Sequence, residues 1–339
     1  MARTRIKSSS IDTTTGAGLP VGTTAQRPAS PTDGTLRLNT TTSYIEVYYN
    51  GFWANVSYAG STFNFEVLII AGGGGGGANE PNPGGDGAGG GGAGGYVTNF
   101  YAVTRGQTYT VVVGAGGNGS GTPANRASNG GNSTVVGSGV NVLAYGGGGG
   151  GSDNDATAGS LPGNGGSGGG AANSYGSSVA GAKGVYPGST YIDATRQGYN
   201  GGDSITSNTS WRGGSGGGGS SSGGSSRTGS FGAAGGNGTS NSIAGSAVTY
   251  AAGGAGGTCS GSSNGGAGTT NTGNGGTGAS SPNSGTTQYT GGNGGSGVVI
   301  FRYASSAALA TGGTVSSYVS SGSTYQVHTF NTSGNLTIL

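Results

Sequence analysis

The sequence contains few of the residues on which enzymes and metal sites depend. It has one cysteine, one histidine and ten acidic residues among 339. The single Cys259 excludes an internal disulfide, and one histidine with one distant cysteine cannot supply the three protein ligands of a zinc site. Asp193 and Asp203 are conceivable members of a glycan-cleaving carboxylate pair, but nothing in the surrounding sequence supports that role. We therefore expect no enzyme, no cofactor and no metal site.

Charge and long hydrophobic runs are also scarce. Charged residues make up 6% of the chain, with a net charge of +2, which gives no basic surface for nucleic acid. The longest apolar run, residues 67–71, is far too short to cross a bilayer. Residues 1–7 are basic but lack the apolar stretch of a signal peptide. We expect a soluble protein made in a cytoplasm, with no nucleic-acid partner and no membrane insertion.

Helical periodicity is missing as well. No segment repeats apolar residues at the spacing of a helix, so helix should be essentially absent. Runs of β-branched and aromatic residues bounded by glycine or asparagine predict strands instead. In the glycine-rich part these are residues 65–71, 95–103, 107–113, 133–136, 140–145, 247–251 and 297–303. The C-terminal stretch adds residues 313–319, 324–330 and 334–339.

Glycine is what the chain has in excess, at 87 residues, and many of these form runs such as 72–77 and 146–151. An ordered glycine loses roughly 0.5–1 kcal/mol more chain entropy than alanine, so glycine should stand where no side chain fits. Nine prolines and irregular spacing exclude collagen. We predict extended polyglycine-II-like legs, packed laterally through backbone hydrogen bonds. The alternative is that residues 152–290 form one long flexible excursion.

A loose repeat runs through this region. Asn-Gly-Gly or a variant recurs every 35–37 residues, at Asn129, Asn164, Asn200, Asn237 and Asn274. Such spacing suits a chain that runs out and back, with a turn at each asparagine.

The predicted fold is all-β: a small N-terminal β-hairpin module and a glycine-rich, β-sandwich-like body with polyglycine-II-like legs. In the module, Asn50-Gly51 between alternating segments predicts a hairpin within a three-stranded meander. So few apolar groups cannot build an independent core, so the module should oligomerise. The predicted divisions are an attachment arm (1–18), the module (19–58), the glycine-rich domain (63–303) and C-terminal strands that close the body (304–339).

Three short motifs resemble ligand-binding or catalytic motifs, but the surrounding residues favour structural roles. Residues 114–119 spell G-x-G-x-x-G, but the following residues cannot begin the helix that a dinucleotide site needs. Residues 153–155 resemble the start of a calcium loop, yet position 164 is Asn where a bidentate Glu is required, which favours a solvated turn. His328 lies within an apolar segment and should be structural.

Aromatic residues in the glycine-rich region form the candidate receptor-binding site. They are Tyr175, Tyr186, Tyr191, Tyr199, Trp211 and Phe231. Arg196, Arg212 and Arg227 lie nearby in the sequence, and aromatic and arginine side chains are typical interface anchors. The alternative is that the rings cover the edges of glycine layers, where neighbouring chains have no side chains.

Two sequence signatures resemble the glycine-rich tail-fibre and virion-appendage proteins of marine bacteriophages. The first runs from residues 19–28 through 34–39 to 50–53. The second frames the glycine-rich region with residues 65–73, 94–97, 109–117 and 294–303. Residues 325–334 are similar to the strand pair that usually precedes such a domain, but here no further glycine-rich unit follows them.

The resemblance implies a virion surface protein, often trimeric, that takes part in host attachment and has no catalytic residues. The partners expected are further copies of the chain, another virion protein at residues 1–18, and a host surface glycan or outer-membrane protein. The expected location is the virion, after assembly in the host cytoplasm. A head decoration or collar protein without receptor binding is the alternative. An ice-binding protein is a third interpretation, disfavoured by the irregular 35–37 spacing.

Overall fold

The computed structural model describes residues 19–42, 44–56, 62–81, 86–153, 161–172, 180–184, 196–204, 212–282 and 287–339. The chain divides into two compact units, Met1–Ser61 and Thr62–Leu339, which are described separately below. Within the described residues the regular structure is β, apart from the short 3-10 helix η2 (Thr24–Gln26). The predicted all-β class is confirmed.

The N-terminal unit holds a four-stranded sheet in the order β1-β2-β3-β4. Its strands are β1 (Val21–Gly22), β2 (Leu36–Asn39), β3 (Tyr44–Tyr49) and β4 (Phe52–Asn55). The last three form the predicted antiparallel meander. Asn50 and Gly51 both have positive φ, 51° and 88°, as the hairpin turn between β3 and β4 requires. Strand β1, parallel to β2, was not predicted because two residues carry no pattern.

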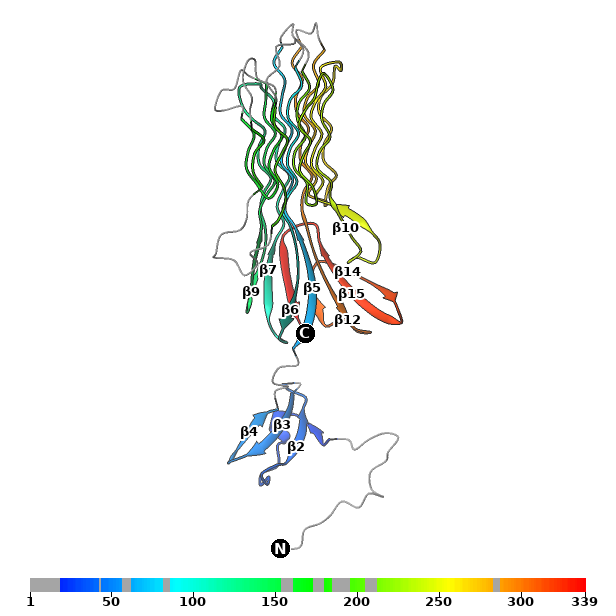
Figure 1. The fold of residues 1–339 in the computed structure, drawn as a ribbon. Coiled ribbons are helices and arrows are strands. Elements are labelled where there is room, and N and C mark those ends of the chain that lie inside the picture. The colour runs from blue at the N-terminus through cyan, green and yellow to red at the C-terminus, as the bar shows by residue number, and fades with distance from the viewer. Residues whose placement is uncertain are drawn as a thin grey trace. The chain divides into compact units, whose positions relative to one another are not determined.

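Two five-stranded sheets form a sandwich in the second unit (Figure 1). The first has the order β14-β15-β12-β5-β6 and the second β13-β16-β7-β8-β9. The strands of the first are β5 (Phe63–Ile70), β6 (Tyr96–Val103), β12 (Val298–Ala304), β14 (Thr314–Ser320) and β15 (Ser323–Phe330). Those of the second are β7 (Thr108–Val112), β8 (Ser133–Gly137), β9 (Val140–Ala144), β13 (Ala310–Thr311) and β16 (Gly334–Ile338). Apart from β13, these strands agree with the predicted ones to within two residues.

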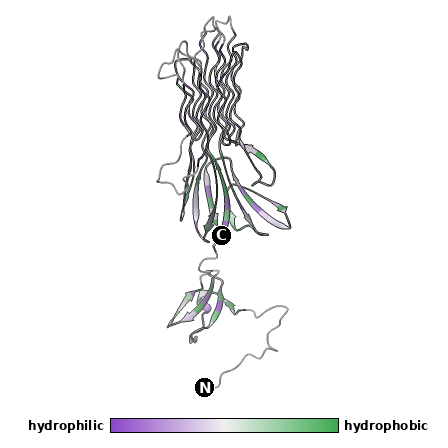
Figure 2. Ribbon diagram, in the orientation of Figure 1, coloured by the Kyte–Doolittle hydropathy of each residue, from purple (hydrophilic) through white to green (hydrophobic). Residues whose placement is uncertain are grey.

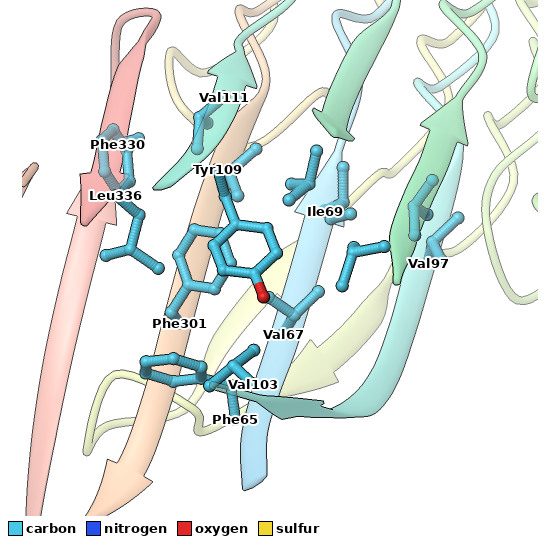
Figure 3. Close-up of a cluster of buried hydrophobic side chains, with 14 of the residues drawn as sticks. Phe65, Val67, Ile69, Val97, Val103, Tyr109, Val111, Phe301, Phe330 and Leu336 are labelled. Atoms are coloured by element: carbon cyan, nitrogen blue, oxygen red, sulfur yellow. The ribbon is translucent and has the colours of Figure 1, made fainter. Parts of the chain in front are cut away.

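The main hydrophobic core combines residues of both sheets (Figure 3). Phe65, Val67 and Ile69 alternate along β5 and are buried in one cluster with Tyr109 and Leu336 of the second sheet. Alternation at period two places one face of each strand in the core. The C-terminal strands belong to this core, because β15 pairs with β12 and β16 pairs with β7.

A second cluster covers part of the other face of the first sheet. Leu68, Ile70 and Ile300 pack there with Ile243 and Tyr250. The last two residues come from the hairpin of β10 (Thr239–Asn241) and β11 (Val248–Tyr250) and its connecting turn. Burial on two faces explains why residues 67–71 form a continuous apolar run rather than an alternating one.

The glycine runs form extended legs that project from one end of the sandwich (Figure 1). In the leg 72–77 the first and fourth amides donate to leg 128–131, the second and fifth to leg 292–295, and the third and sixth to leg 89–92. Its carbonyls accept from legs 147–153, 117–120 and 276–279. A repeat of three residues in the direction of hydrogen bonding is the signature of the three-fold polyproline-II-type helix. The predicted polyglycine-II-like legs are confirmed.

Close approach of the legs explains why they are made of glycine. A Cβ atom on Gly75 would lie within 3.0 Å of the carbonyl oxygen of Asn118, and one on Gly91 would meet that of Gly74 in the same way. Figure 2 shows strong hydrophobic colour on strands of the sandwich and little on the legs. The legs are therefore joined by main-chain hydrogen bonds between bare backbones. We call this bundle of legs the glycine lattice.

The prediction of a turn at each repeated asparagine is wrong for Asn129, Asn164, Asn200 and Asn237, which lie within legs, whereas Asn274 directly follows the turn at residues 270–273. Asn129 Oδ1 accepts from the amide of Gly149, and Asn164 Oδ1 accepts from that of Lys183, at 2.9 and 2.8 Å. Asn274 Oδ1 accepts from the amide of Ala252 at 2.9 Å. These side chains accept from backbone amides in place of a main-chain carbonyl, so these asparagines complete the hydrogen bonding of the lattice.

Candidate functional site

The end of the glycine lattice opposite the sandwich is the candidate functional site, and we call it the distal end. The leg that follows β5 reaches it at Ala78, and the leg that begins at Asp86 runs back from it to β6. Described segments of the distal end are residues 78–81, 120–127, 227–231, 258–263, 280–282 and 287–289, with Asp86, Asp153 and Arg212. At ~3.1 Å per residue, the leg 87–95 holds this end about 28 Å from β6.

Short side chains fasten the turns of the distal end to one another. Asn79 Oδ1 accepts from the amide of Tyr289 at 2.6 Å. Ser120 Oγ donates to the carbonyl of Asn125 at 2.6 Å, and Ser152 Oγ donates to the same carbonyl at 2.7 Å. The bond from Ser120 closes one turn, whereas the bonds of Asn79 and Ser152 join segments that are distant in the sequence, so the segments of the distal end are tied together.

Buried charges lie beneath these turns. Asp86 and Arg212, which are 4% and 3% exposed, form an ion pair with Nε 3.2 Å from Oδ1. The two residues also form an isolated parallel β-bridge, so backbone and side chains fix the same contact. Asp153 and Arg227 are buried as well, at 4% and 2% exposure. The four side chains are formally neutral as a set.

The pKa shifts of this cluster favour a structural role over a catalytic one. Burial lowers the pKa of the Arg227 guanidinium, and the nearby Arg212 lowers it further, while Asp86 and Asp153 oppose both effects. Burial raises the pKa of the Cys259 thiol, which disfavours the thiolate that a nucleophile requires. The cluster can therefore hold turns in place, and Cys259 is not activated for reaction.

Four of the six predicted receptor-binding residues, Tyr175, Tyr186, Tyr191 and Trp211, lie outside the described residues. Tyr199 is half-buried, with the Arg196 guanidinium 4.5 Å from its ring centroid. Phe231 is 75% exposed.

Tyr199 and Phe231 are not brought together. The Tyr199 amide donates to the carbonyl of Gly219, whereas the Phe231 carbonyl lies beside Gly213. Gly213 and Gly219 belong to the same extended leg and are six residues apart, which corresponds to about 19 Å. Phe231 lies at the distal end and Tyr199 toward the sandwich, so of these two only Phe231 belongs to the candidate site.

Two interpretations of charged residues are corrected by burial. Arg212 and Arg227 are nearly inaccessible rather than surface anchors, and Asp153 is not part of a solvated turn. The buried cluster was missed because its members are far apart in the sequence. The sequence does contain a signal for this cluster. Asp86 directly precedes a Gly-Ala pair and Arg212 directly precedes a Gly-Gly pair, and a leg begins at each of these positions.

Other motifs lie in structural positions. The G-x-G-x-x-G segment is part of a leg, in which the Gly117 amide donates to Gly73 at 2.8 Å. His328 is fully buried in β15, with Nδ1 2.8 Å from the Gly312 carbonyl and Nε2 3.2 Å from the Tyr303 hydroxyl. It is structural, as predicted. Among the described residues no cluster of three potential metal ligands occurs, and none of their helices is long and apolar enough to span a membrane.

The fold defines an all-β protein in which a sandwich carries a polyglycine II lattice. A family model described as a glycine-rich domain matches residues 50–304. The chain belongs to this glycine-rich domain family. No curated protein matches the chain. The family match ends at the last residue of β12, although the strands β15 and β16 beyond it complete the two sheets.

Proposed function

We propose that this protein is a structural and adhesive component of a bacteriophage virion, a homotrimeric tail fibre whose distal end contacts the host cell. The observation that carries the proposal is the glycine lattice, which joins a sandwich to a set of turns through hydrogen-bonded legs. Such a spacer presents turns on a rigid support, and binding residues commonly lie on loops held by a rigid scaffold.

The resemblance of the sequence to phage tail-fibre and virion-appendage proteins supports the same function. The proposal includes an attachment role for residues 1–18, which lie outside the described residues, toward another virion protein. The partner at the distal end would be a host surface glycan or an outer-membrane protein. Phe231 is an exposed aromatic residue at this end that could stack on a sugar or an apolar side chain.

Antibody labelling of virions tests the assignment. Gold-labelled antibody against the body should decorate the tail, and an excess of the purified protein should slow adsorption of phage to host cells. Decoration of the head or collar without an effect on adsorption would replace the proposal with the decoration-protein alternative. Virions that carry no label would contradict both.

The proposed role is binding without catalysis. Purified protein incubated with host polysaccharide should leave the viscosity of the solution unchanged. A progressive fall in viscosity, absent from a heat-denatured control, would show cleavage and contradict this part of the proposal.

A further inference from the structure

The two faces of the N-terminal sheet differ sharply in chemistry. Cross-strand partners lie on the same face of a sheet, and faces alternate along each strand. Register pairs Arg37 with Glu46 and Tyr48 with Trp53, which places these four residues on one face. The opposite face consists of apolar residues, and we call it the apolar module face. Its members are Val21, Leu36, Leu38, Ile45, Val47, Tyr49, Phe52, Ala54 and Val56.

The polar face is the one that the unit buries. Glu46 is fully buried, with its carboxylate 2.6 Å from Arg27 Nη2 and 3.3 Å from Arg37 Nη1. Asn39 Nδ2 donates to the same carboxylate at 3.0 Å. Hydrogen bonding to Arg27 lowers the pKa of Glu46, although burial opposes this. The segment before β2 therefore covers a charged network rather than a hydrophobic core.

The apolar module face is exposed in contrast. Val21 is 64% exposed, Tyr49 63%, Phe52 57% and Leu36 42%. Among the described residues of this unit, the fully buried side chains are polar: Arg37, Asn39 and Glu46. A buried ionic network contributes little net stability. The unit also lacks the apolar burial on which small folds depend.

We infer that the apolar module face packs against the same face of two further copies of the chain, forming the core of a three-fold interface. This inference rests on the trimer of the proposed function and names the surface that makes it. The face carries no charged side chain, so nothing in it selects an acidic or a basic partner. Residues 1–18 offer only Met1, Ile6 and Ile11 as large apolar side chains, too few to cover nine apolar positions.

The size of the face is that of an interaction surface. Its most exposed apolar side chains are 39–64% exposed and belong to Val21, Leu36, Ile45, Tyr49, Phe52 and Val56. They amount to roughly 500 Å² per copy, if a large side chain carries about 150–200 Å². An exposed apolar patch of several hundred Å² is typical of a site of association, and the number of copies is that of the trimer in the proposed function.

The mass of the full-length protein in solution tests the inference. We expect the wild type to sediment as a trimer, and the double variant Leu36→Glu with Phe52→Glu to sediment as a monomer, a threefold fall in mass. The matched control is Tyr44→Glu, an exposed residue on the opposite face, which should remain trimeric. Fluorescence of Trp53 in a Trp211→Phe background should be alike in all three proteins and report an intact module.

Other outcomes overturn the inference. A wild-type dimer would contradict the three-fold arrangement. A double variant that remains trimeric with a folded module would place the self-association elsewhere. A wild-type monomer whose double variant loses thermal stability would place a segment of the same chain on the face. Because mass is measured on purified protein, these results stand apart from the labelling of virions, so failure of the interface and failure of the virion assignment are distinguishable.

Discussion

At the scale of single residues, the position of each glycine in the lattice decides what it tolerates. Gly119 and Gly121 are two residues apart in the sequence. A Cβ on Gly119 would lie within 3.0 Å of the Gly291 carbonyl oxygen, whereas one on Gly121 would meet nothing within 4 Å. Composition alone treats the two as equivalent, because the contact comes from a leg that is distant in the sequence.

Substitution of this pair by alanine separates steric exclusion from chain entropy. We expect Gly119→Ala to lower the free energy of unfolding by about 3 kcal/mol, since the bare backbones must move apart. Gly121→Ala should change it by less than about 0.5 kcal/mol. Urea denaturation followed by circular dichroism measures both. Equal effects of the two substitutions would contradict the close-packing explanation.

His328 gives the fold a dependence on pH that belongs to one residue. Burial lowers the pKa of His328 below its ordinary 6.5 in the folded protein. As the pH falls through about 6.5, the unfolded chain binds a proton that the folded chain does not. The free energy of unfolding should therefore be largest above pH 6.5 and decrease as the pH falls toward the lower, folded-state pKa.

The single histidine of the chain makes this dependence easy to isolate. Thermal melting between pH 7.5 and 5.5 should show a falling midpoint in the wild type and a flatter profile in His328→Gln. An identical slope in both proteins would assign the dependence to other groups.

At the scale of elements, legs are held in register by contacts at their ends as well as along their length. The Asp86–Arg212 pair joins the beginnings of two parallel legs, and the amides of residues 87, 90 and 93 donate to residues 212, 215 and 218. Removal of one partner leaves the other charge buried, which costs about 3–5 kcal/mol in comparable sites.

The variant Asp86→Asn tests this contact. We expect it to lower the free energy of unfolding by about 3 kcal/mol. The control Asp203→Asn changes an exposed residue whose Oδ1 accepts from the Gly181 amide at 2.7 Å, a role that an asparagine oxygen also performs. Its effect should stay within about 0.5 kcal/mol. Chemical denaturation of the two variants side by side gives the comparison, and similar losses would contradict the role of the buried pair.

Strands were predictable from the sequence because each carries its own apolar pattern. Residues 107–113 and 324–330, for example, alternate or cluster β-branched and aromatic residues between turn signals, and both form strands. β13 and β10 were missed because two or three polar and small residues leave no pattern. Legs were predictable as a class from their glycine runs, but not which legs are neighbours, since identical glycines contain no pairing information.

At the scale of the whole molecule, two kinds of cohesion operate in the second unit. The sandwich is stabilised by buried side chains such as Phe65, Tyr109 and Leu336. The lattice is stabilised by backbone hydrogen bonds, each with a net contribution of about 1 kcal/mol. Its amides donate to carbonyls of neighbouring legs and, at some positions, to asparagine side chains. The candidate site could not be predicted as a unit, because the distal end is assembled by this pairing from turns spread over 200 residues of sequence.

Hydrogen exchange of the leg amides, measured on the intact protein, tests the lattice most directly. If the legs are closely packed, the amides of residues 72–77 and 87–95 should exchange as slowly as those of β5 and β12, because each is bonded within the bundle. The same protection should extend to residues 212–218 and 273–279. Complete exchange of these legs within seconds, while β5 and β12 remain protected, would contradict the lattice and favour a flexible glycine-rich excursion.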